Sequence, residues 1–211
     1  MAYTDFTLLD LKNKFHITNQ ITHLFDNEKI VPIEASRFLL QQLEEAEELP
    51  IKSEKARSEL IIAPILMELR RMNDKFFTIY SGDNLIVDRA NGLAGECDFI
   101  LAKETDSFSI NLPIISVVEA KRQNIELGIN QCAAQLYGAS LFNEKYETKV
   151  PKVYGCVTTA DAWKFMLLEK NTVKIDRTTY YKSDLGKILG VFNQIIACLL
   201  YTSPSPRDIG E

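Results

Sequence analysis

The chain has 211 residues, of which 46% are hydrophobic and 25% are charged. This composition is typical of one soluble globular domain with a buried core and room for a small appendage. Its net charge of -5 argues against a surface coated for non-specific nucleic-acid binding, although a local basic patch is compatible with it.

The cysteines and the apolar segments exclude several other classes of protein. Cys97, Cys132, Cys156 and Cys198 lie far apart among apolar residues and form no CxxC pair, which excludes a zinc ribbon and a disulfide framework. The N-terminus has no apolar core of signal-peptide length, and no segment has the roughly 18 apolar residues of a membrane helix. We therefore expect a cytoplasmic protein with no membrane partner.

Three parts are expected along the chain. Residues 1–50 read as a helical N-terminal extension, because "PIEASRFLLQQLEEAEELP" has apolar residues near helical spacing and ends at a proline. Residues 51–200 form the main domain. The turn-rich residues 201–211 offer no face to bury and are predicted to be a disordered tail or a cloning scar.

Within the main domain, helical and strand periods alternate. A helix is predicted to start at Ser53 as its N-cap and to kink at Pro64. The remaining elements follow in order: strands at 75–82, 92–104 and 110–122 with a loop at 105–109, a helix at 125–142, strand-like runs at 152–159, 162–170 and 172–181, and a helix at 185–200. This order predicts an α/β (α+β) layered domain with a central mixed sheet.

The stretch "PIISVVEAKRQN" contains the main functional signal. An apolar strand at 114–118 runs directly into Glu119, Ala120 and Lys121, whose charges are costly to bury without compensation. Alternate strand residues share a face, so Glu119 and Lys121 project together. Asp98 lies in the preceding strand, and pairing of the two strands would bring it close to Glu119. Two adjacent carboxylates repel each other unless a cation lies between them.

Oxygen ligands of this kind suit Mg²⁺ or Mn²⁺ with water and a substrate phosphate. The backbone carbonyl of Ala120 can supply a further oxygen. Lys121 can orient a metal-bound water or stabilise negative charge that develops on the phosphate. The sequence therefore predicts metal-dependent phosphoryl chemistry at the end of this strand.

This pattern resembles the PD-(D/E)xK nuclease superfamily. The resemblance is carried by Asp98 in "GECDF", by "EAK" at 119–121 and by the α-β-β-β-α-β order, over roughly residues 53–170; Cys97 stands where the motif's name has proline. The segment "VYGCVTTADAWKFMLL" is similar to nuclease domains of restriction-system proteins. The resemblance implies a restriction-endonuclease-like fold and a Mg²⁺-dependent nuclease. DNA is expected as the substrate in preference to RNA, and Mn²⁺ is expected to substitute for Mg²⁺.

The resemblance also implies supporting residues and partners. Glu59, in "ARSELIIAP", matches the helix acid that adds a metal contact in this family. Gln131 and Gln135 match a glutamine that faces the site, and the sequence does not choose between them. A homodimer or a larger defence or repair complex is expected to be the working assembly.

Two alternatives stand beside the nuclease. One is a catalytically inactive nuclease-fold module that binds nucleic acid or a protein. The other is an interaction domain in which "EAK" is only a solvated strand end. Phosphate contacts would come from Arg70, Arg71, Lys75 and Arg122, whereas His16 and His23 are expected to be structural or surface residues.

Overall fold

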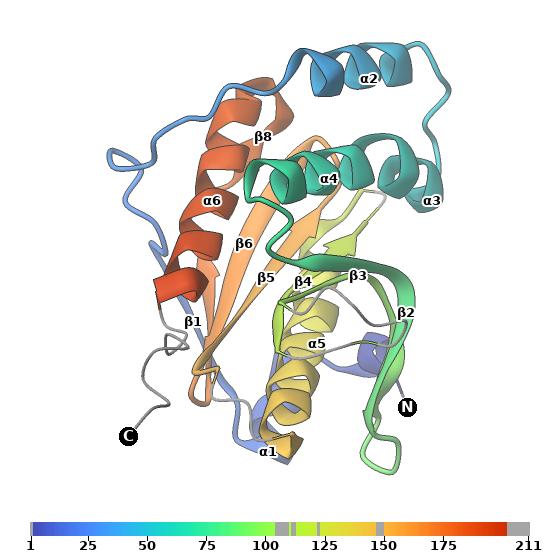
Figure 1. The fold of residues 1–211 in the computed structure, drawn as a ribbon. Coiled ribbons are helices and arrows are strands. Elements are labelled where there is room, and N and C mark those ends of the chain that lie inside the picture. Colours follow the sequence, from blue (N-terminus) through green and yellow to red (C-terminus); the bar gives the residue numbers. More distant parts are fainter. Residues whose placement is uncertain (1, 104–109, 111–112, 122, 147–149, 202–211) are drawn as a thin grey trace.

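The computed structural model describes residues 2–103, 110, 113–121, 123–146 and 150–201. These residues form one mixed sheet with helices on both faces (Figure 1), as the alternating periods predicted. The strands are β1 (Thr18–Thr22), β2 (Thr78–Asp88), β3 (Leu93–Ala102), β4 (Ile114–Ala120), β5 (Lys152–Thr158), β6 (Ala162–Glu169), β7 (Thr172–Asp176) and β8 (Tyr180–Tyr181). The helices are α1 (Leu8–Phe15), α2 (Arg37–Glu47), α3 (Glu54–Arg57), α4 (Ala63–Met72), α5 (Ile125–Lys145) and α6 (Leu185–Tyr201), with short helical turns at Tyr3–Asp5, Ser58–Ile62 and Lys182–Asp184.

The sheet has the order β1-β7-β6-β5-β4-β3-β2, and β8 pairs with β6. Strands β2, β3 and β4 form an antiparallel meander, and α5 then crosses over so that β5 lies parallel to β4. The predicted loop at 105–109 and the tail from 202 onward lie outside the described residues.

The sequence predicted a helical extension over residues 1–50, but this segment also contains a strand. It contains α1 and α2, but also β1, which pairs in parallel with β7 from Thr18↔Thr172 to Thr22↔Asp176. The side chains of β1 are mostly exposed. An edge strand held by backbone hydrogen bonds on one side has no need of apolar alternation, which explains why its sequence, "TNQIT", gave no strand signal.

The helix predicted at Ser53 begins there. The Ser53 hydroxyl accepts a hydrogen bond from the Ala56 N–H at 3.0 Å and caps α3. Its continuation is a wide π-helical turn, in which the Ala63 N–H donates to the Ser58 carbonyl, followed by α4 with Pro64 in its first turn. Proline has no N–H to continue the regular pattern, so the irregularity falls just before it.

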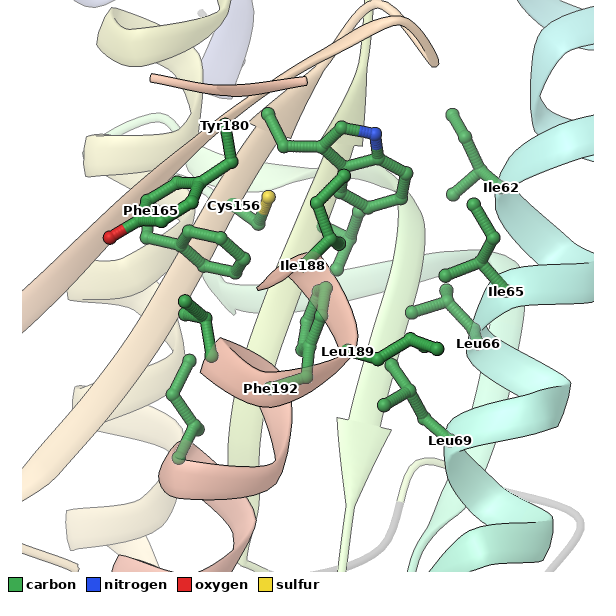
Figure 2. Close-up of a cluster of buried hydrophobic side chains, with 14 of the residues drawn as sticks. Ile62, Ile65, Leu66, Leu69, Cys156, Phe165, Tyr180, Ile188, Leu189 and Phe192 are labelled. Atoms are coloured by element: carbon green, nitrogen blue, oxygen red, sulfur yellow. The ribbon is translucent and has the colours of Figure 1, made fainter. Parts of the chain in front are cut away.

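Two apolar cores lie on opposite faces of the sheet. One is covered by α2, α4 and α6, where α4 residues face Ile188, Leu189 and Phe192 of α6 (Figure 2), and the Phe165 and Phe192 rings pack with centroids 5.0 Å apart. The other is covered by α1 and α5 and includes Val117 of β4. Because Glu119 is two residues after Val117, it projects toward α5.

Among the described helices, none has both the length and the apolar character required to cross a membrane.

Candidate active site

The site forms where β3 and β4 stop pairing. Their ladder runs from Ala102↔Ile114 to Phe99↔Val118, so that Asp98 and Glu119 are the next facing pair. Beyond this point β3 continues along β2, while β4 continues along β5. One oxygen of Asp98, Oδ2, accepts the Ala120 N–H at 2.7 Å and satisfies a donor that the ladder leaves free. The structure thus brings together the two carboxylates that the sequence pattern had paired.

Glu119 is the buried centre of the site, with a side chain that is 2% exposed. The Lys121 ammonium donates to its Oε1 at 2.7 Å, and the Gln135 amide donates to its Oε2 at 2.8 Å. Gln135 is fully buried on α5. Of the two candidate glutamines, Gln135 is therefore the one that holds Glu119, and Gln131 lies one turn earlier, half-buried.

The pKa values of the carboxyl groups reflect this burial. Desolvation, followed by the charge of Asp98, raises the pKa of Glu119 to about 7, against the opposing effects of Lys121 and Gln135. Desolvation also raises the pKa of Asp98. For Lys121, burial favours the neutral amine, but the charge and hydrogen bond of Glu119 outweigh it and raise the pKa. The site therefore holds an ammonium and two neighbouring carboxyl groups, both of whose pKa values are raised by burial.

Close packing against α5 positions Lys121. Its backbone N–H donates to the Thr158 carbonyl at 2.7 Å. A methyl group added at Gly128 would lie 2.9 Å from Lys121 Cγ and would overlap Val157. The absence of a side chain at Gly128 is what lets the lysine stem cross this helix.

The two acids of the preceding helical segment differ in their surroundings. Glu59 has a side chain that is 61% exposed, and it pairs with Lys55 at 3.7 Å. Burial has the largest effect on the pKa values of Asp98 and Lys121, and the charge of Glu54, the first residue of α3, makes a smaller contribution that raises both. The motif pattern selected Glu59 and contained no signal for Glu54 beyond its position next to the Ser53 cap.

The donor set fits a hard divalent cation. Asp98, Glu119 and the Ala120 carbonyl offer oxygen atoms, and a bound cation would favour the ionised form of the two carboxyl groups, whose pKa values are raised mainly by burial. No group of three or more Asp, Glu, His or Cys side chains in the described part of the chain is arranged as a metal site. A bound ion would thus rely on water and substrate oxygens for its remaining ligands, as Mg²⁺ commonly does.

Two of the basic residues considered for phosphate contact, Arg70 and Arg71, lie away from this site. Arg70 donates to the Phe77 carbonyl and Arg71 pairs with Glu68, and both lie at the far end of α4, a helix about 15 Å long. Arg122 lies outside the described residues. Lys75 lies just past the end of α4, His16 caps α1, and His23 lines a separate pocket beside β1.

Neither a scan against protein-family models nor a search of curated proteins finds a match to this chain, so the geometry of the site is the basis for assigning a function.

Proposed function

We propose that this protein is a metal-dependent nuclease that hydrolyses phosphodiester bonds, with DNA as its substrate. The observation that carries the proposal is the setting of Glu119, which is buried, held by Lys121 and Gln135, and placed opposite Asp98 where two strands part. A solvated strand end would not bury its carboxylate or provide it with an amide from another helix.

The chain order supports a restriction-endonuclease-like fold as part of this proposal. A helix, an antiparallel meander, a crossover helix and a parallel strand follow one another as α4, β2–β4, α5 and β5. The candidate residues lie near the carboxyl ends of the parallel pair β4 and β5, where ligands bind in open α/β sheets. Cleavage of both DNA strands would need two such sites, in a homodimer or a larger defence or repair complex.

Each residue has a distinct role in the proposed hydrolysis. Asp98 and Glu119, with the Ala120 carbonyl, would hold Mg²⁺, and Mn²⁺ would substitute. The bound ion would lower the pKa of its water and polarise the phosphoryl oxygens. Lys121 would donate to the attacking water or to the charge that develops on the phosphate, and Gln135 would keep the Glu119 carboxylate oriented.

Cleavage of supercoiled plasmid, single-stranded DNA and RNA in Mg²⁺, Mn²⁺ or EDTA tests the proposal. We expect divalent-dependent cleavage of DNA that EDTA abolishes. If no substrate is cleaved and calorimetry detects no Mn²⁺ binding, the proposal is wrong. Nucleic-acid binding without turnover would instead identify a catalytically inactive module.

The two acids before the sheet provide a matched test. Because the charge of Glu54 reaches the site and Glu59 is exposed beside Lys55, Glu54→Gln should raise the Mg²⁺ concentration for half-maximal cleavage by about 10-fold. Glu59→Gln should behave as wild type. Equal effects of the two substitutions, measured by plasmid nicking across a Mg²⁺ titration, would contradict the assignment of Glu54.

Gly128→Ala should displace Lys121, since the new methyl group would meet the lysine stem and Val157. We expect a loss of about 1–3 kcal/mol in the free energy of unfolding and a fall in cleavage rate of at least about 10-fold. Gly138→Ala is the control, because it overpacks the same helix against Tyr3 and leaves Lys121 untouched. Urea denaturation and plasmid nicking compare the two, and a similar loss of rate in both would contradict the prediction.

A further inference from the structure

We propose that Arg57 is a positioning residue, which docks α3 on the loop after β5 and thereby sets Glu54 and Lys121 relative to each other. This inference rests on the proposed nuclease function.

Helix α3 is the first turn of a helical run that continues through the π-helical turn into α4. The π-helical turn interrupts the regular hydrogen bonding between α3 and α4, and the Ser53 cap satisfies only the first turn. The last residue of α3, Arg57, has a side chain that is 19% exposed; its Nη1 donates to the Thr159 carbonyl at 2.6 Å and pairs with Asp161 at 3.2 Å. These contacts therefore fasten the start of the helical run to residues about a hundred positions later.

The loop that receives Arg57 is internally braced. The Ala160 N–H donates to the Thr158 hydroxyl at 2.9 Å, and the Trp163 indole N–H donates to the Ala160 carbonyl at 2.9 Å. Ala160 has a φ of 71°, a left-handed conformation that is strained for a non-glycine residue. These hydrogen bonds hold the loop in one shape despite that strain.

The end of β5, next to this loop, also holds the backbone of Lys121. The carbonyl of Thr158 accepts the backbone N–H of Lys121, and the carbonyl of Thr159, the next residue, accepts from Arg57. Two adjacent carbonyls thus anchor Lys121 and α3. Glu54 is three residues before Arg57, a neighbouring position on the helix surface.

The packing of Arg57 leaves one of its donor groups without a partner in the described part of the chain, which does not favour stability. Its Nε is buried and has no hydrogen-bond acceptor among the described residues, and an unpaired buried donor is destabilising. An arginine that served only to stabilise the fold would be expected to satisfy this group. The contacts of Arg57 instead fix the position of α3, and with it Glu54, relative to Lys121.

The test compares Arg57→Met, Arg57→Lys and Asp161→Asn with Lys55→Met, whose side chain lies on the same short helix and is 83% exposed in wild type. Plasmid nicking is measured as a maximal rate, as a Mg²⁺ titration and as a pH profile, and thermal melting checks that each variant folds. We expect Arg57→Met to lower the maximal rate by about 10-fold or more and to raise the half-maximal Mg²⁺ concentration. Arg57→Lys should recover part of both, and Lys55→Met should match wild type.

Asp161→Asn keeps the test decisive if Arg57→Met does not fold, because the Asp161 side chain is 64% exposed and its removal spares the core. It should shift the Mg²⁺ titration in the same direction by a smaller factor. Wild-type rate, Mg²⁺ dependence and pH profile in folded Arg57→Met, or in Asp161→Asn if the former is unfolded, would overturn the inference while the nuclease stands. A wild-type protein that neither cleaves nor binds Mn²⁺ would overturn both.

Discussion

Replacing Lys121 by methionine is expected to reduce divalent-dependent cleavage by at least about 100-fold, the effect of removing one donor from a buried charge-stabilising site. Methionine keeps an apolar stem over Gly128 and removes the ammonium that lies 2.7 Å from Glu119. Single-turnover nicking of plasmid at saturating Mg²⁺ measures the chemical step directly.

The loss of Lys121 should not unfold the protein at mildly acidic pH. Lys121 lowers the pKa of Glu119, which is already about 7, so its removal lets the buried carboxyl group take up a proton and avoid an unpaired charge. Lys187→Met, on the exposed face of α6 beside Asp184, is the control and should retain activity. A Lys121→Met protein that is folded and cleaves at the wild-type rate would remove Lys121 from the mechanism.

The second large effect concerns stability, and Glu119→Gln should remove the part of its pH dependence that comes from Glu119. Folding raises the Glu119 pKa from an ordinary value of 4.5 to about 7, so the folded state binds this proton more tightly than the unfolded state. In EDTA, the wild type should lose roughly 3 kcal/mol of stability as pH rises from about 4.5 to 7, at about 1.4 kcal/mol for each pH unit between the two pKa values. Glu119→Gln lacks this titration and should be the more stable protein above pH 7, although inactive.

Urea denaturation at pH 5 and pH 8, with EDTA or Mg²⁺, measures both parts of this prediction. Mg²⁺ should restore the stability of the wild type at pH 8, since it binds the ionised carboxylates of the folded state, and should have little effect on Glu119→Gln. Glu169→Gln is the control, because Lys174 lowers the pKa of that carboxyl group below its ordinary value of 4.5, so its titration lies below pH 5 and should not contribute to the difference between the two pH values. If Mg²⁺ does not change the free energy of unfolding of the wild type at pH 8, the result would favour the interaction-domain alternative.

The sequence by itself determined most of the helices and strands of residues 51–200 and the approach of Asp98 to Glu119. An apolar strand that ends in Glu119 and Lys121 must place both side chains on one face, because strand geometry alternates at every residue. The same local rules located the Ser53 cap and the antiparallel neighbour that carries Asp98. These features depend on spacing along the chain, which can be read without knowing the fold.

Only the tertiary structure decided which residues of each helix reach the site. Gln131 and Gln135 are four residues apart, and Glu54 and Glu59 are five apart. Which residue of each pair lies nearer the site depends on how its helix is rotated and packed against the sheet. For the helical segment that precedes the sheet, this rotation is set by the π-helical turn at Ser58–Ile62 and by the hydrogen bond of Arg57 to the loop after β5. Likewise β1 becomes a strand because β7 offers it an edge. Such contacts join residues far apart in the chain, and no periodicity in the sequence encodes them.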